Sequence, residues 1–315
     1  MSTHTGLGVD NPDFVRPWGS SAEGAFQVVI APTSAAPVPG WVHTTLRVAA
    51  VEGEETLEHV AGEEETLVVP LAGSWRVEVT DADGSTHTAD LPGRATVFDG
   101  PTDVVYAGRG STLRLASTTD GPARVALCGA PATKSAAPKP FRHITAGEVP
   151  VELRGAGQAS REVRNMGLPD VLDADSFLVC EVITPAGNWS SWPPHKHDEE
   201  RPGEETELEE IYYLETRATD VRNTDPVGYL RAYGSSSERP LDVLSEVRTG
   251  DVVLVPHGWH GPAVAAPDAD LYYLNVMAGP GPERAWRICD DPAHAWVRDS
   301  WAAEPVDPRL TKGQQ

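Results

Sequence analysis

Short apolar runs separated by glycine and proline are the dominant pattern along the chain. In the first half these runs lie at residues 26–30, 44–51, 66–71, 75–79, 96–98, 104–106, 112–115 and 124–127. In the second half they lie at residues 149–153, 160–163, 177–183, 211–214, 228–233, 242–247, 252–255 and 271–276. Few stretches repeat apolar residues with the period of a helix, whereas short runs between turn residues are typical of strands. We therefore predict an all-β protein of the sandwich or barrel type, with one short helix near residues 290–301.

The composition changes between residues 130 and 140, where alanine, proline, lysine and serine replace the apolar runs. A segment without apolar periodicity is typical of a connection between domains. We therefore expect two domains, at residues 1–138 and 139–315. The halves also echo each other, because glutamates directly precede an apolar strand at 63–71 and again at 209–214. This similarity predicts two related barrels in tandem.

The second half carries a set of histidines and glutamates with the spacing of a metal site. His195 and His197 lie two residues apart, and the pair Glu209–Glu210 and then His260 follow. On a strand, residues two apart face the same side, so both histidines point the same way. An isolated pair of this kind is more often a surface feature, but here glycines and prolines stand where a barrel needs its corners. Three imidazoles and one carboxylate suit a divalent ion such as Zn, Mn, Fe, Ni or Co. The first half lacks such a histidine pair, and we expect it to be free of metal.

The charge and the cysteines narrow the range of partners and compartments. The 315 residues include 25 Lys and Arg against 47 Asp and Glu, which gives a formal net charge of −22. Such acidity disfavours nucleic acids and anionic membranes as partners. No signal peptide and no run of about 20 apolar residues is present, and three widely spaced cysteines form no disulfide framework. We expect a soluble cytoplasmic protein that acts on a small molecule, and the sequence leaves a homo-oligomer open.

These motifs resemble the cupin superfamily, in which a histidine pair, a glutamate and a later histidine share one jelly-roll barrel. A more specific resemblance is to the 5-deoxy-glucuronate isomerase family of inositol catabolism, and it is carried by the residues 187–199, 198–210 and 272–280. It extends over about residues 142–296 and is weak in the first half. The resemblance implies a bicupin fold of two tandem jelly-roll β-barrels. It also implies metal-assisted isomerisation of 5-deoxy-D-glucuronate, an aldose, to 2-deoxy-5-keto-D-gluconate, a ketose, in myo-inositol catabolism.

The same resemblance implies the identity of the metal ligands, which are His195, His197, Glu210 and His260. Adjacent residues on a strand face opposite sides, so only one of Glu209 and Glu210 can reach the metal. Glu210 directly precedes the apolar strand, and we expect Glu209 to be solvated or to face the hairpin. Lys196 lies between the two histidines and is expected to point away from them, as a structural or surface residue.

Two further residues are candidates for catalysis. Tyr212 shares the ligand face of its strand and is placed to donate a hydrogen bond to a substrate oxygen, with core packing as the alternative. Arg231 alternates with Tyr229 and Tyr233, and a guanidinium there would bind the substrate carboxylate through two parallel hydrogen bonds. The arginines that compete for this role are Arg248, Arg284 and Arg287.

Several other functions share this set of residues. The alternatives are a metal-dependent cupin dioxygenase or decarboxylase, a related uronate ketol-isomerase and a storage protein that binds sugar without catalysis. Isomerisation itself needs a Lewis acid and, for proton transfer, a general base. The sequence leaves the choice between proton and hydride transfer open.

Overall fold

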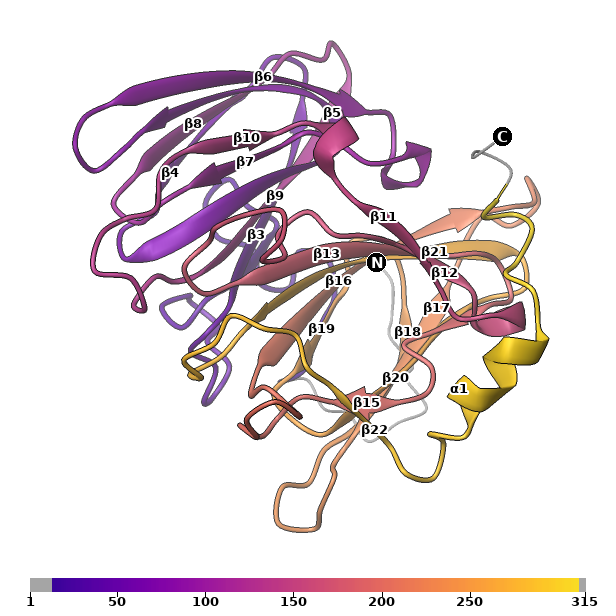
Figure 1. Cartoon of the computed structure of the whole chain (residues 1–315). Coiled ribbons are helices and arrows are strands. Elements are labelled where there is room, and N and C mark those ends of the chain that lie inside the picture. Colours follow the sequence, from indigo (N-terminus) through magenta and orange to yellow (C-terminus); the bar gives the residue numbers. More distant parts are fainter. Residues whose placement is uncertain (1–12, 312–315) are drawn as a thin grey trace.

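The computed structural model describes residues 13–311, and nearly all of its regular elements are strands (Figure 1). Neighbouring strands pair antiparallel in both halves of the chain. The only α-helix among the described residues, α1 (Val297–Ser300), follows the last strand and continues into a 3₁₀ turn, η4 (Trp301–Ala303). These observations confirm the all-β prediction and the short helix near the end. Within residues 13–311, no helix has the length and the apolar character needed to cross a bilayer.

The first half forms one nine-stranded sheet that folds over on itself. Its strands are β2 (Val28–Ile30), β3 (Thr45–Glu52), β4 (Thr56–Val60), β5 (Glu64–Thr80), β6 (Thr86–Arg94), β7 (Val104–Ala107), β8 (Thr112–Ser117), β9 (Pro122–Pro131) and β10 (Arg142–Ile144). The long strand β5 pairs with β7 and β9 over its first part and with β6 and β8 over its second. Its bulge at Gly73 has φ 79, and a Cβ there would lie 2.7 Å from that of Ala123. The bulge bends β5 from one layer to the other, as the corner of a barrel requires.

Two sheets form the barrel of the second half. The seven-stranded sheet has the order β1-β19-β16-β21-β13-β12-β11, and the six-stranded sheet has the order β18-β17-β20-β15-β22 with β14 beside β20. Their bounds are β1 (Val15–Arg16), β11 (Val151–Arg154), β12 (Arg161–Arg164), β13 (Leu178–Thr184), β14 (Trp189–Ser190), β15 (His195–Lys196), β16 (Glu209–Ala218), β17 (Gly228–Tyr233), β18 (Asp242–Val247), β19 (Val252–Val255), β20 (Trp259–Ala265), β21 (Ala269–Ala278) and β22 (Cys289–Asp290). Buried side chains of both sheets, among them Cys180, Leu214 and Leu230, form the barrel core.

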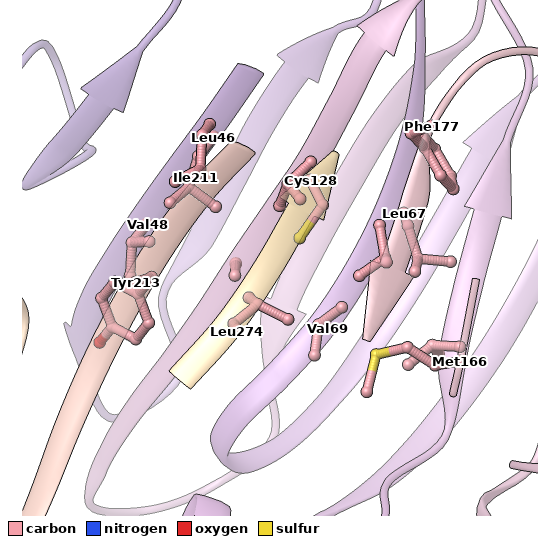
Figure 2. Close-up of a cluster of buried hydrophobic side chains, with 14 of the residues drawn as sticks. Leu46, Val48, Leu67, Val69, Cys128, Met166, Phe177, Ile211, Tyr213 and Leu274 are labelled. Carbon is pink, nitrogen blue, oxygen red and sulfur yellow. The ribbon is translucent and has the colours of Figure 1, made fainter. Parts of the chain in front are cut away.

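The two halves are tied together by strands and by a shared core. Strand β1, near the start of the chain, pairs with β19 of the second half, whereas β10, after the linker, pairs with β7 of the first. The domain division at residue 138 stays a prediction, and strand pairing crosses it in both directions. Figure 2 shows the apolar cluster between the halves, where residues from both contribute. The labelled members are Leu46, Val48, Leu67, Val69, Cys128, Met166, Phe177, Ile211, Tyr213 and Leu274.

One predicted strand is a 3₁₀ turn instead. The apolar residues around Val97 were expected to form a strand, but η1 (Val97–Asp99) occupies this position. The Thr96 hydroxyl accepts a hydrogen bond from the backbone N–H of Phe98 at 3.2 Å. The Asp99 carboxylate accepts one from the N–H of Thr96 at 2.7 Å. This reciprocal capping box favours a helical turn over a three-residue strand.

Candidate active site

Three buried histidines converge inside the second barrel, from β15, from the residue directly after it and from the adjacent strand β20. His195 on β15 is directly opposite His260 on β20 in the strand register. The ring of His260 lies 4.4 Å from that of His195 and 4.7 Å from that of His197, centroid to centroid. One nitrogen from each ring lies within 4.8 Å of the others, so the group has the geometry to hold a metal ion. The prediction that His195 and His197 face the same side therefore agrees with the structure.

Glu210 on β16 joins this cluster. Its Oε2 lies 3.0 Å from Nε2 of His197 and 3.1 Å from Nε2 of His260, and all three side chains are buried. Burial alone would raise the pKa of Glu210, but the two imidazoles outweigh it and hold the pKa at about 2. Glu210 is therefore an anion in this setting, as a metal-ligating carboxylate must be.

The orientation of the side chains fits a divalent cation. The Nδ1 atoms of His195, His197 and His260 face the backbone carbonyls of Pro193, Leu208 and Gly258 at 3.4, 3.1 and 3.3 Å. An Nδ1–H that donates to a carbonyl leaves Nε2 free to bind a metal, which is the usual arrangement around ligating histidines. Among residues 13–311, Oε1 of Glu210 has no hydrogen-bond partner, and Nε2 of His260 makes no hydrogen bond although Oε2 of Glu210 lies 3.1 Å away; both atoms are buried. Because an unsatisfied buried polar atom costs about 1–3 kcal/mol, a cation that binds both would remove this cost.

The backbone around His260 is held close to the segment before His195. Gly261 has φ 103, and a Cβ at this position would lie 1.9 Å from the carbonyl oxygen of Ser191. Only glycine permits this approach. The close packing brings Ser191 and the pair of histidine-bearing strands to one side of the barrel.

A cavity of about 410 Å³ opens beside His195. Tyr212, predicted to be catalytic, lines it together with Ser191 and Tyr273. The Ser191 hydroxyl lies 3.2 Å from the hydroxyl of Tyr212 and 3.2 Å from that of Tyr273. Burial raises the pKa of Tyr212 well above its usual value, and the negative charge of Glu210 adds to this effect. The phenol therefore stays protonated and able to donate. Sequence reasoning missed Ser191 and Tyr273, although both lie within segments that carry the family resemblance, residues 187–199 and 272–280.

The prediction that Arg231 faces the cavity is wrong. On β17 the buried residues Leu230 and Ala232 point into the barrel, and Ala232 is the register partner of His260. Arg231 therefore points outward, where it pairs with Asp242. The competing arginines are also engaged elsewhere: Arg248 pairs with Asp225, Arg284 donates to backbone carbonyls and Arg287 pairs with Glu283. The arginines that line the cavity are Arg154, Arg161 and Arg298.

Glu209 and Lys196 are more buried than expected. Glu209 faces away from the histidines as predicted, but it is not solvated, because its carboxylate accepts the backbone N–H groups of residues 42–44 in the first half. Lys196 points away from the histidines too, and its ammonium lies 2.6 Å from Asp198 and 2.8 Å from Glu205. Glu205 is fully buried. Lys196 is therefore a structural residue that fixes the acidic 198–210 segment.

Comparisons with known proteins show the family of the chain. The model of the KduI/IolB family matches residues 14–297. The 5-deoxy-glucuronate isomerase of Geobacillus thermodenitrificans is 37% identical over 262 residues, which cover 83% of this chain and 88% of that protein. The 5-deoxy-glucuronate isomerase of Halalkalibacterium halodurans is 40% identical over 245 residues, which cover 77% of this chain and 82% of that protein.

Solved structures show the same architecture. An IolB-like protein from Salmonella typhimurium LT2 is 35% identical, has a TM-score of 0.77, and the match covers 90% of this chain and 99% of that one. The oxalate decarboxylase of Lactobacillus farciminis has a TM-score of 0.61 at 12% identity, with 96% of this chain and 93% of that one covered. At this low identity the second likeness shows the fold alone. Together they confirm the cupin fold that the motifs predicted.

Proposed function

The chain belongs to the KduI/IolB family, and on that premise we propose that it is a 5-deoxy-glucuronate isomerase. It converts 5-deoxy-D-glucuronate to 2-deoxy-5-keto-D-gluconate in myo-inositol catabolism and acts in the cytoplasm on this small sugar acid. The observation that carries the proposal is the group of three buried imidazoles in a chain that is 37–40% identical to proteins of that name over most of its length. Neither a nucleic acid nor a membrane enters this function.

His195, His197, Glu210 and His260 would hold a divalent ion, of which Zn, Mn, Fe, Ni and Co are the candidates. The support is the donor set itself, three imidazoles and one anionic carboxylate, with two buried atoms that make no hydrogen bond among the described residues. When bound, such an ion supplies Lewis-acid stabilisation of negative charge on the substrate oxygens. The four ligands come from two sheets of one barrel, so their positions are fixed by the fold before a metal arrives.

The hydroxyl groups beside the cluster handle protons on the substrate oxygens. Moving a carbonyl from one carbon to the next requires one oxygen to gain a proton and its neighbour to lose one. Tyr212 donates to a substrate oxygen, and Ser191 links its hydroxyl to that of Tyr273. This chain of three buried hydroxyls can pass a proton between adjacent oxygens without bulk water. General acid catalysis of this type contributes about 10²–10⁴-fold.

Metal analysis coupled to an activity assay tests the proposal. The purified protein, loaded in turn with each of the five metals, is incubated with 5-deoxy-D-glucuronate without oxygen, and the ketose is followed by NMR. We expect turnover with at least one redox-silent metal, since isomerisation consumes no oxidant. His260→Ala should lose bound metal. The loss of several kcal/mol of transition-state stabilisation should lower the rate on the order of 10³-fold. His87→Ala is the control, because that histidine lies in the first half and is 38% exposed.

Two results would contradict the proposal. One is a wild-type protein that binds none of the five metals or converts no 5-deoxy-D-glucuronate with any of them. The other is turnover that depends on oxygen, which would favour a dioxygenase. Loss to solvent of deuterium placed on C2 of the substrate would indicate proton transfer through an enediol. Full retention would fit either a hydride shift or a shielded base that returns the same deuteron.

A further inference from the structure

Three arginines, Arg154, Arg161 and Arg298, line the cavity beside His195. Two of them already have an acidic partner. Nη2 of Arg154 lies 2.9 Å from a carboxylate oxygen of Glu152, and Nη2 of Arg298 donates to Asp290 at 2.6 Å. Their charges are thus neutralised locally, and the third arginine differs from them in this respect.

Arg161 is buried and has no acidic partner. The residue is 8% exposed, and among residues 13–311 its Nη1 donates only to the backbone carbonyls of Ala159 at 3.0 Å and Trp192 at 3.5 Å. Within residues 13–311, no carboxylate contacts it. Burial lowers the pKa of Arg161 to about 10, and the charges of Arg154 and Arg298 contribute to the lowering. The guanidinium is still cationic at neutral pH. The charge of Glu152, which also lines the cavity, partly opposes this lowering, but that carboxylate is hydrogen-bonded to Arg154, so Arg161 is a buried positive charge beside the cavity without a direct counter-ion.

The fold directs this charge towards the site. On β12, Arg161 and Val163 both line the cavity, as the strand alternation requires, and Val163 belongs to the barrel core. The guanidinium of Arg161 lies 5.5 Å from the ring centroid of Trp301, and that of Arg298 lies 5.2 Å from the same ring. The indole from the end of the chain therefore holds the guanidinium by a cation–π contact.

We propose that Arg161 binds the carboxylate of the sugar-acid substrate and thereby makes the cavity selective for uronates over neutral sugars. This inference rests on the proposed function. A bidentate pair with Arg161 places the carboxylate at one end of the cavity and leaves the carbonyl end for the histidines. Arg161 takes the role that the sequence had suggested for Arg231. Trp301 positions its guanidinium through the cation–π contact.

The test compares two substrates in wild type and in Arg161 variants. The first substrate is 5-deoxy-D-glucuronate, and the second is the neutral sugar that carries a hydroxymethyl group in place of its carboxylate. In wild type we expect kcat/KM for the acid to exceed that for the neutral sugar by about 100-fold or more, since an unpaired buried cation penalises the neutral ligand. Arg161→Met should lose most of this ratio, through a higher KM for the acid. Arg161→Lys, which keeps the charge but not the planar fork, should lie between the two.

The ratio of the two substrates separates recognition from a structural role. If Arg161→Met lowers kcat/KM equally for both, the residue supports the fold and the inference is overturned. Arg222→Gln is the control for loss of one positive charge, because this arginine is 87% exposed and pairs only with Asp220; it should leave the ratio unchanged.

A binding measurement keeps this inference apart from the proposed function. Calorimetric titration of wild type and Arg161→Met with D-glucuronate requires no turnover. If wild type converts neither sugar, the isomerase proposal fails, but binding of D-glucuronate that Arg161→Met weakens at least tenfold still supports a carboxylate site. Equal affinity of the two proteins for D-glucuronate would overturn the inference even if the isomerase activity is present.

Discussion

Replacing Glu181 by glutamine tests how strongly a buried ionic cluster joins the two halves. Glu181 lies on β13 and has no exposed surface. Arg94, from β6 of the first half, donates to both of its carboxylate oxygens at 2.7 Å. Arg164 donates to it at 2.9 Å and the hydroxyl of Tyr272 at 2.9 Å, both from the second half. The carboxylate is thus the common acceptor for groups from both barrels.

The expected cost follows chiefly from Arg94, which would lose its paired carboxylate, whereas Arg164 keeps Glu162 at 2.7 Å. Burial alone would raise the pKa of Glu181, but Arg94 and Arg164 outweigh it and lower the pKa, so the residue is an anion at neutral pH. Breaking a buried ion pair from one side costs about 3–5 kcal/mol. A glutamine oxygen still accepts one hydrogen bond, and Arg94 keeps the carbonyl of Gly100 at 2.7 Å. We therefore expect Glu181→Gln to lower the free energy of unfolding by about 3 kcal/mol, the lower end of that range.

Equilibrium unfolding in urea at pH 7 measures this difference. The control is Asp90→Asn, which breaks the exposed pair with Arg76, where the side chains are 68% and 53% exposed; such a pair contributes about 1 kcal/mol or less. A double variant, Glu181→Leu with Arg94→Met, should recover part of the loss because it removes the unpaired charge of Arg94. A decrease below about 1 kcal/mol for Glu181→Gln, or an equal decrease for Asp90→Asn, would refute the reasoning.

Three further predictions concern separate parts of the molecule. Glu209→Gln leaves one oxygen where two now accept the N–H groups of residues 42–44. We expect the free energy of unfolding to fall by about 1–3 kcal/mol and metal binding, measured by calorimetry, to weaken at least tenfold. If neither the stability nor the metal affinity changes, the prediction is wrong. His59 is buried with a pKa of about 4, against 6.5 unfolded, chiefly because of burial. The unfolded chain therefore binds more protons between these values, and stability should fall by up to about 2 kcal/mol from pH 7.5 to pH 5. This contribution should vanish in His59→Leu. Urea unfolding of both proteins at both pH values measures it, and an equal loss of stability between pH 7.5 and pH 5 in wild type and in His59→Leu would contradict the reasoning. Tyr212→Phe keeps the aromatic ring, whose centroid lies 5.0 Å from that of Tyr273. This variant should bind as much metal as wild type but have a kcat lower by about 10²-fold. A kcat within threefold of wild type would contradict the role of Tyr212 as a donor.

The sequence predicted the site where a local rule was sufficient. The two-residue period of a strand places His195 and His197 on one face whatever the rest of the chain does, and the structure brings their rings to His260. The same rule separated Glu209 from Glu210. It gave no information on what Glu209 meets, because its partners at residues 42–44 lie more than 160 positions away in the chain. The local sequence pattern does not predict partners that lie so far away in the chain.

Alternation also explains the wrong prediction for Arg231. The period assigns residues to two faces, but it does not say which face is inside. On β17, one face carries Tyr229, Arg231 and Tyr233, and the other carries Leu230 and Ala232. The aromatic face looked suitable for a sugar, yet the small Ala232 is the residue that fits opposite His260. Arg161 had no such signal, since its place beside the cavity depends on how β12 packs in the barrel.

Strand β16 shows how the first half contributes to the site without residues of its own in it. Glu209, Ile211 and Tyr213 face the first half, where the last two join the shared core. Glu210, Tyr212 and Leu214 face the interior of the second barrel. The candidate metal site and the interface between the halves are thus the two faces of one strand. Because a displaced Glu209 would carry Glu210 with it, the first barrel acts as a rigid support for this candidate ligand.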